Sequence, residues 1–166
     1  MNGPHALVAV AATLAALSAP AAAAAPLELH GLKATAPVAF SAPEKAGLDA
    51  LRVVHPADAK AGGEKLSLTA GAFPKDSGMT DPELLDYVAS TFLGASGAGK
   101  AVERTVLGKT AKGRAFEKKI PSPSLAEVFV ATKKEGGKVV LAFVFSPSFA
   151  KEAEAAVAAI AESLKE

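Results

Sequence analysis

The chain of 166 residues has no cysteine, no tryptophan and a single tyrosine. Without cysteine it can form no disulfide and no thiolate metal site, and it has no thiol to carry a lipid anchor. Stability must therefore come from a hydrophobic core, which one domain of this size can bury. The sequence also contains no Gly-x-Ser-x-Gly pattern, so it lacks the nucleophile turn of the α/β-hydrolases.

A strong net charge is missing as well. The 18 Lys and Arg residues almost balance the 17 Asp and Glu residues, which leaves a formal net charge of +1. This balance argues against a dedicated polyanion-binding protein. The lack of tryptophan also leaves few aromatic side chains on which the bases of a single strand could stack. We therefore expect no nucleic-acid partner.

A long stretch without charge opens the chain. Residues 6–17 read ALVAVAATLAAL, and Pro20 and a run of alanines follow. This pattern predicts a secretory signal peptide over residues 1–24 and a periplasmic or secreted protein. The small residues expected at the cleavage site are Ala22, Ala24 and Ala25. The alternative is an uncleaved anchor, because the stretch is just long enough to span a bilayer, but we expect no transmembrane segment in the mature chain.

The remainder predicts a flexible leader over residues 25–31 and one α+β domain over residues 32–166. Apolar residues recur at alternate positions, the period of half-buried strands. The strands expected from this period are residues 32–42, 51–54, 65–73, 101–107, 114–120, 125–132 and 138–145. Turns are expected at Gly108, Gly113 and Gly136–Gly137. The last strand is apolar at every position after Lys138, which is typical of a central strand covered on both sides.

Two helices are expected. Thr80 and Glu83 form a capping-box pattern that predicts a helix over residues 81–93. Pro147 opens a closing helix whose apolar residues repeat at helical spacing up to Leu164. Short turns between consecutive strands favour an antiparallel sheet of about six to seven strands. We expect a helix packed on each face of it, an α/β/α sandwich.

This order of elements resembles the PsbP-like fold family. The resemblance rests on an opening strand that ends in proline, a mid-chain helix, and a closing hairpin that leads into a final helix. These features are Val38–Pro43, Leu84–Leu93 and the hairpin before Phe149–Leu164. The resemblance covers almost all of the mature chain and implies a small exported domain that binds or assists other components. It carries over no catalytic residue.

No motif predicts a cofactor or a metal. Residues 94–100 follow the phosphate-loop pattern, but Ala101 stands where that loop needs Ser or Thr to bind magnesium. The stretch also follows a helix and precedes a strand, the reverse of a phosphate loop. The histidines, His5, His30 and His55, have no second histidine at ligand spacing.

Acidic residues crowd the start of the first helix at Asp76, Asp81, Glu83 and Asp86. The positive end of the helix dipole accounts for them. A weak calcium site in the loop over residues 75–81 is the alternative, although its spacing matches no calcium loop.

Basic residues concentrate in residues 100–138, which carry 10 Lys or Arg and 4 Asp or Glu. Neighbouring strands could bring several of these cations to one sheet edge, where they would attract an anionic lipid, a glycolipid or an acidic envelope protein. The residues expected to form this site are Lys109, Lys112, Arg114, Lys118, Lys119, Lys133 and Lys134. The alternative is that lysines on edge strands and turns prevent aggregation.

Three functions are compatible with these patterns. The first is an exported, non-enzymatic binding or accessory domain that acts on an envelope component or partner protein. The second is a small periplasmic hydrolase whose site is assembled from distant residues around His55. The third is a carrier with an apolar pocket between sheet and helix. A cleft that holds His55, a buried carboxylate and a serine would favour the hydrolase.

Overall fold

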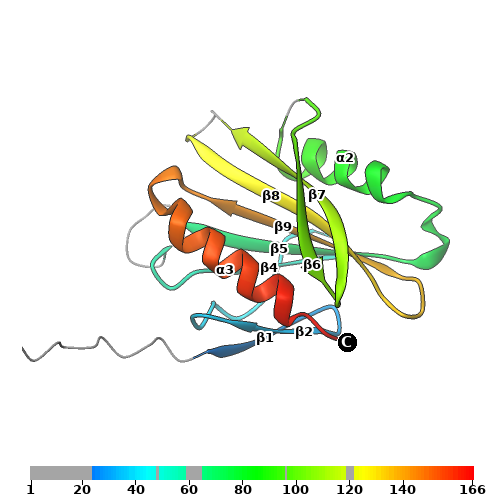
Figure 1. Ribbon diagram of the computed structural model, residues 1–166, viewed down its shortest axis with the longest axis horizontal. Helices are drawn as coiled ribbons and strands as arrows, with labels where there is room; N and C mark the ends of the chain where they lie inside the picture. Colours follow the sequence, from blue (N-terminus) through cyan, green and yellow to red (C-terminus); the bar gives the residue numbers. More distant parts are fainter. Residues whose placement is uncertain (1–23, 48, 59–64, 96, 119–121) are drawn as a thin grey trace, which may run out of the picture.

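A computed structural model describes residues 24–47, 49–58, 65–95, 97–118 and 122–166 (Figure 1). These residues form an α+β fold with a two-stranded hairpin, a seven-stranded antiparallel sheet and two α-helices. The elements are β1 (Ala25–Leu29), β2 (Leu32–Ala36), β3 (Glu44–Lys45), β4 (Ala50–Val54), β5 (Leu66–Phe73), α2 (Asp81–Thr91), β6 (Lys100–Val106), β7 (Lys109–Lys118), β8 (Ser124–Thr132), β9 (Lys138–Phe145) and α3 (Ala150–Ser163). Short 3₁₀ turns at Lys75–Ser77 and Pro147–Phe149 precede the two α-helices.

The large sheet has the strand order β3-β4-β5-β9-β8-β7-β6. Strand β9 lies at its centre and pairs along its whole length with β5 on one side and β8 on the other. The prediction that the all-apolar strand is central is confirmed. Strands β6 to β9 follow one another as hairpins, whereas the β5–β9 pair joins segments that are distant in sequence.

Helix α2 begins with the capping box that the sequence predicts. The Thr80 side chain accepts a hydrogen bond from the Glu83 backbone amide, while the Glu83 carboxylate accepts one of 2.7 Å from the Thr80 amide. These bonds satisfy amides that the first helical turn leaves without partners. They also lower the pKa of Glu83, because they favour its charged form.

Two separate hydrophobic clusters contact the sheet, and β9 contributes alternate residues to them. The first, the α3 cluster, contains Leu141 and Phe143 of β9 together with α3 residues such as Val157 and Ile160. The second, the α2 cluster, contains Val140 and Ala142 of β9 and buried residues of α2. Successive residues of a strand point to opposite sides. The side chains of β9 are therefore buried on both sides, one set in each cluster. Neither described helix is long and apolar enough to cross a membrane.

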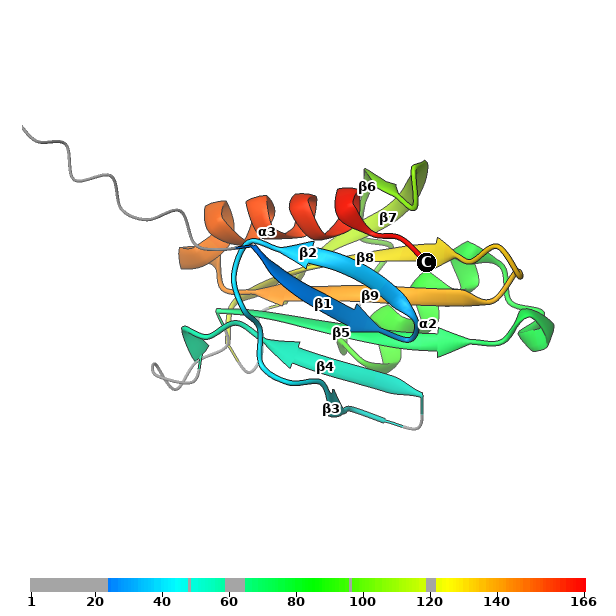
Figure 2. The same ribbon diagram turned by 90° about the horizontal axis from the view of Figure 1, so that it is seen from below.

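The predicted flexible leader over residues 25–31 is wrong for the described structure, which has strand β1 there. β1 pairs with β2 in an antiparallel hairpin that lies beside α3 (Figure 2). Leu27 and Leu29 point into the α3 cluster, and backbone hydrogen bonds of 2.7 and 2.8 Å join Lys33 to Lys165. The segment is ordered by its pairing with the adjacent β2, through a turn in which His30 and Gly31 have positive φ angles of 52° and 76°, and by packing of its leucines into the α3 cluster.

The predicted turn at Gly113 is also wrong. The chain turns earlier, where Leu107 and Gly108 have positive φ angles of 51° and 72°, and β7 begins at Lys109. Gly113 lies within β7, opposite Phe129 of β8. A Cβ atom at Gly113 would overlap the Phe129 ring, so this glycine serves a close approach between strands.

Candidate functional site

A groove of about 260 Å³ lies between the C-terminal half of α2 and the sheet. Its floor is made of small residues of β5 and of Val140, Ala142 and Val144 of β9. The strand register places Thr69 opposite Ala142, and Gly71 opposite Val140. Ser67, which is buried, continues the same row of β5. Because these side chains are short, they do not fill the space under the helix as a row of leucines would.

The walls of the groove are apolar. Helix α2 and the residues that follow it contribute Val88, Phe92 and Leu93, and the β3–β4 segment contributes Ala46 and Ala50. The two walls approach each other at Gly47, where a Cβ atom would lie 3.6 Å from the Phe92 ring. The groove therefore combines apolar walls with a small-residue floor, the surface that an apolar ligand requires.

Two cations line the groove. Arg52 lies on β4, opposite Thr69, and Lys118 lies at the end of β7. Strands β4 and β7 stand on opposite sides of the β5-β9-β8 group, so the two charges reach the groove from two sides. No Asp or Glu is among the described residues that line it. Arg52 is not an uncompensated charge, however, because Glu44 of β3 lies directly opposite it in the strand register.

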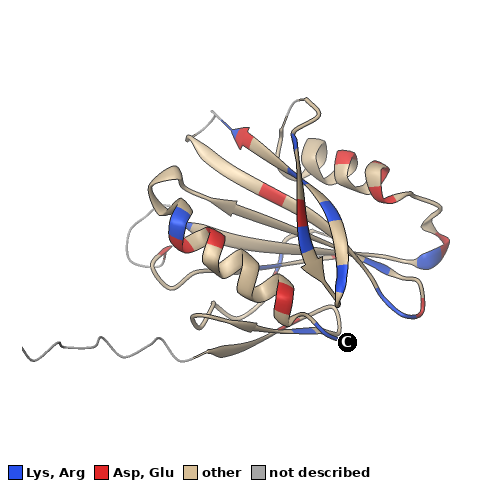
Figure 3. Ribbon diagram, in the orientation of Figure 1, with Lys and Arg blue, Asp and Glu red and all other residues tan. Residues whose placement is uncertain are grey.

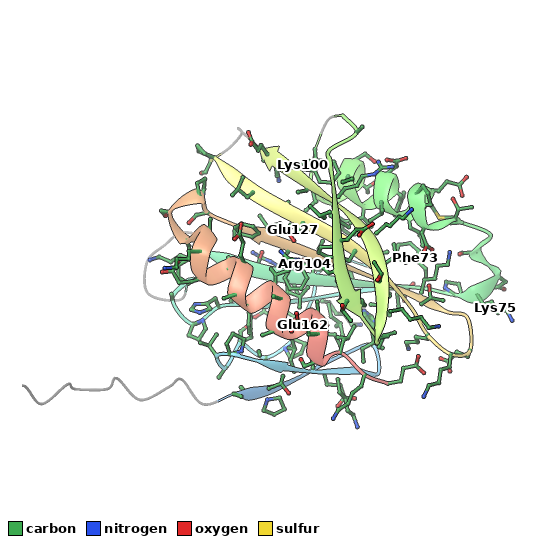
Figure 4. All side chains as sticks on the ribbon, in the orientation of Figure 1. Phe73, Lys75, Lys100, Arg104, Glu127 and Glu162 are labelled. Atoms are coloured by element: carbon green, nitrogen blue, oxygen red, sulfur yellow. The ribbon has the colours of Figure 1, made fainter. Side chains whose placement is uncertain are left out.

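An aromatic ridge borders the groove. Phe73, Tyr87 and Phe92 follow one another in edge-to-face contacts, each with ring centroids 6.1 Å apart. Figure 4 labels Phe73 where β5 ends near α2. Tyr87 and Phe92 are each 42% exposed and are the exposed large hydrophobic residues of the described structure. The ridge extends the apolar surface of the groove outward.

The described residues of the predicted basic site are spread along β7 and beyond the end of β8 (Figure 3). Lys109 and Lys118 stand at opposite ends of β7, about 30 Å apart at about 3.3 Å per residue. Lys112, Arg114 and Lys118 occupy alternate positions of β7 and point to the same side. Lys133 and Lys134 lie beyond β8, near the β8–β9 turn, and Lys119 lies outside the described residues.

Several of these cations already have partners. Arg114 forms an ion pair with Asp86 of α2. The Lys133 ammonium donates a 2.6 Å hydrogen bond to the His30 carbonyl oxygen. At Lys134 the backbone amide, not the ammonium, donates a 2.7 Å hydrogen bond to the carboxylate of Glu166. Lys109, Lys112, Lys118 and Lys134 have no ion-pair partner among the described residues.

One further cation of the basic segment stabilises the fold. Arg104 on β6 forms an ion pair of 3.2 Å with Glu127 on β8, and Figure 4 labels both residues. Glu127 is 8% exposed. A carboxylate buried this far needs a cationic partner, so Arg104 is engaged in structure rather than in ligand binding.

Lys109 and Lys112 line a second, larger hollow of about 540 Å³ beside the first turn of α2. Its lining also includes Asp81, whose carboxylate lies 2.7 Å from the ammonium of Lys138. Asp81 is thus compensated by Lys138. Lys109 and Lys112 remain as the two cations of this hollow without an ion-pair partner among the described residues.

His55 lies outside the groove, in an aromatic contact with Phe40 and Phe149 at centroid distances of 5.9 and 5.1 Å. Its Nδ1 accepts a 3.1 Å hydrogen bond from the Ala57 amide. Burial lowers the pKa of His55; Asp58 opposes this effect and Lys65 adds to it. The Asp58 carboxylate accepts hydrogen bonds from the backbone amides of Lys65 and Leu66.

The structure does not bring a serine hydroxyl onto His55 within the described residues. His30 is likewise structural, since its Nε2 lies 2.9 Å from the Ala70 carbonyl oxygen. The described ranges contain no cluster of three His, Asp or Glu side chains that could hold a metal ion. The phosphate-loop-like stretch lies between α2 and β6, as the sequence predicts, and Ser96 falls outside the described residues.

Comparison with known proteins gives a likeness of fold. No family model matches the chain, and no curated protein matches it. A solved structure from Bacteroides thetaiotaomicron VPI-5482 aligns with a TM-score of 0.53 at 6% identity, covering 81% of this chain and 44% of that one. This chain thus spans less than half of the Bacteroides protein. PA94 from Pseudomonas aeruginosa, a protein of unknown function, aligns with a TM-score of 0.44 at 12% identity, covering 81% and 90%.

Apart from Lys118, the residues that line the groove were not predicted from the sequence. Its floor combines β5 and β9, which are far apart in the chain, and its cations come from two further strands. A signal was present in the alternate small residues Ser67, Thr69 and Gly71 of β5. A strand that presents only small side chains to one side leaves space there, provided that its neighbour does the same at Ala142.

Proposed function

We propose that this chain is an exported, non-catalytic binding domain that holds an apolar ligand in the groove between α2 and the sheet. Among the functions compatible with the sequence, this is the carrier with a pocket between sheet and helix. The groove supports it because apolar walls surround a floor of small residues. Ligand sites are concave and mostly apolar, with a few polar groups that fix orientation.

The proposal includes the layering of the domain. We infer that α2 and α3 cover opposite faces of the sheet, which gives the α/β/α sandwich. The division of β9 between two clusters supports this layering, since the odd residues Leu141 and Phe143 join α3 and the even residues Val140 and Ala142 join α2. The resemblance to the PsbP-like fold family remains a prediction and agrees with a role without catalysis.

Export is the second component of the proposal, and the uncharged N-terminal stretch supports it. Ala22 lies outside the described residues, whereas Ala25 is the first residue of β1. Cleavage after Ala24 would leave the hairpin complete. The intact mass of protein secreted by the native host should correspond to a chain that starts at Ala25. A full-length species retained in the membrane would contradict export.

Ligand binding can be tested with N-phenyl-1-naphthylamine, a neutral apolar dye whose fluorescence rises when it leaves water. Thr69 lies on the groove floor, so Thr69→Phe should occupy the space and weaken dye binding at least about tenfold, or about 1.4 kcal/mol. Thr105→Phe, on the exposed side of edge strand β6, is the matched control and should bind as the unmodified protein does. Equal binding by both variants, or no binding by the unmodified protein, would contradict the proposal.

A further inference from the structure

The β6–β7 hairpin separates from β8 before β7 reaches the hairpin turn. Strand β7 pairs with β8 only between Gly113, opposite Phe129, and Lys118. Residues 109–112 of β7 continue along β6 alone, and residues 130–132 of β8 continue along β9 alone. Figure 1 shows the tip of the hairpin turning from β8 toward α3, which β6 contacts. A gap therefore opens between two neighbouring strands of the sheet.

The second hollow, of about 540 Å³, lies in this gap, since its lining includes residues of both separated segments. We infer that the hollow receives an extended, acidic peptide segment of a partner protein, which adds a strand between β7 and β8. This site is separate from the groove and does not depend on the proposed function. The free strand edges, the lining and its charge each support the assignment.

The backbone of the two segments favours an extended chain. Alternate residues of a strand turn their N–H and C=O groups to the same neighbour, so a strand that has lost one neighbour keeps polar groups that the other does not pair. Extended peptides bind at such edges by adding a strand, and main-chain hydrogen bonds supply the affinity. The separated segments run for about 10 Å at about 3.3 Å per residue. This length fits about three residues of an extended peptide.

The lining suits the side chains of such a segment. Leu85 of α2 and Val130 of β8 are buried residues of the α2 cluster and form one apolar side of the hollow. Val106 of β6 belongs to the α3 cluster and lines the other side. Successive side chains of an extended segment point to opposite sides. Apolar β-branched side chains at alternate positions of the peptide would therefore contact Leu85 and Val130 together.

The charge of the lining favours an acidic peptide. Lys109 has no ion-pair partner among the described residues, and the residue opposite it on β6 is not acidic. Lys112 has Glu103 opposite it in the register, so its charge is partly offset. The Asp81 carboxylate is paired with the ammonium of Lys138. The assignment therefore depends on Lys109, which stands beside the hairpin turn and would attract a carboxylate at that end of the gap.

NMR titration of the ¹⁵N-labelled protein with a short peptide tests the assignment. The probe is acetyl-Glu-Val-Thr-Val-Glu-amide, whose two glutamates bring one carboxylate to Lys109 in either strand direction. The amide resonances of residues 109–112 and 130–132 should shift together. The same peptide with both valines N-methylated keeps the side chains but loses two backbone donors, so it should bind at least about tenfold more weakly. Acetyl-Lys-Val-Thr-Val-Lys-amide should also bind at least about tenfold more weakly, because Lys109 repels it.

Variants locate the site. Thr110 is exposed and lines the hollow, so Thr110→Trp should fill the gap and weaken binding of the glutamate peptide at least about tenfold. Thr105→Trp is the matched control, because Thr105 lies opposite Thr110 on β6 but does not line the hollow; it should bind as the unmodified protein does. Lys109→Glu should weaken binding of the glutamate peptide and strengthen binding of the lysine peptide. A loss of folding would weaken both.

The outcomes separate this inference from its rivals and from the proposed function. If neither segment shifts at the highest soluble peptide concentration, or if the N-methylated peptide binds equally well, no added strand forms and the inference is wrong. Equal binding of the two charged peptides would overturn the acidic assignment. Concentration-dependent shifts in both segments without peptide would show that a second copy of the chain occupies the gap instead. Thr69→Phe, which fills the groove, should leave peptide binding unchanged, so either proposal can fail alone.

Discussion

The α3 cluster and the α2 cluster differ in how completely they fill the space beside the sheet. Among the described residues, the α3 cluster contains 22 buried residues and the α2 cluster 11. Hairpin β1–β2 adds a second cover beside α3, so α3 does not pack against the sheet alone. Among the described elements, no hairpin lies beside α2 in this way, and the groove lies where the cover that α2 provides ends.

This difference separates stability from binding. Burial of apolar surface is the main favourable contribution to folding, and most of it lies in the α3 cluster. Beside α2, the sheet presents Gly71 and Ala142 where larger side chains would contribute more stability. A binding groove needs such an unfilled region, because a core packed to full density has no room for a ligand. The α3 cluster therefore contributes most of the buried apolar surface, and the unfilled region beside α2 is where we propose that a ligand binds.

The largest expected effect comes from a charge placed in the α3 cluster. Ile160 is 0% exposed, so Ile160→Asp would bury a carboxylate without a partner. We expect the free energy of unfolding to fall by more than about 4 kcal/mol, enough to prevent stable folding. Urea denaturation followed by circular dichroism measures this change.

The control for this experiment is Glu162→Ala, on the exposed side of the same helix. It should change the free energy of unfolding by less than about 0.5 kcal/mol. Equal urea midpoints for the two variants would show that α3 does not depend on the cluster for its stability.

A comparison of neighbouring residues on β9 tests the difference between the clusters directly. Leu141 belongs to the α3 cluster and Val140 to the α2 cluster, where it also lines the groove. Leu141→Ala should cost about 3 kcal/mol, because it leaves a cavity in a filled core. Val140→Ala should cost about 1.5 kcal/mol, since fewer atoms are lost and the adjacent groove absorbs the space. If Val140→Ala costs as much as Leu141→Ala, the two clusters contribute equally.

The sequence predicted the elements whose signals are local. The capping box at Thr80 and Glu83 located α2, and the turn at Gly136–Gly137 together with an all-apolar run located β9 at the centre of the sheet. It failed at β1, which pairs with the adjacent β2 through the His30–Gly31 turn, a local signal that was not recognised. It also failed at Gly113, which depends on the Phe129 ring of the neighbouring strand, and no local pattern marks such a contact.

The candidate site was less predictable for the same reason. The basic residues were conspicuous as a run in the sequence, yet the strands distribute them from one end of β7 to the other. Arg114 forms an ion pair with Asp86, and Lys118 is the one member of the predicted set, among those that the structure describes, that lines the groove. Its partner in the lining, Arg52, stands on β4 with no neighbouring basic residue in sequence to mark it. Pairing of distant strands creates the site, and composition does not encode that pairing.

The smallest expected effect concerns the border of the α3 cluster at His55. Phe40 and Phe149, which contact His55, pack against that cluster. Burial lowers the pKa of His55 below its ordinary value of 6.5, so the unfolded chain binds a proton in a range where the folded protein does not. Stability therefore rises with pH through this range and is lost as pH falls below about 6.5 toward the folded-state pKa.

Protonation would also remove the hydrogen bond that Nδ1 accepts from the Ala57 amide, so the loss should be below about 1 kcal/mol. Between about pH 7.5 and about pH 5.5, the free energy of unfolding measured by urea denaturation should decline in the unmodified protein. The decline should be smaller in His55→Phe, which keeps the aromatic contacts but cannot titrate. His30 is present in both proteins, so its contribution cancels in the difference. Identical pH profiles for the two proteins would show that the border of the α3 cluster is insensitive to the charge of His55, and that pH acts on this domain elsewhere.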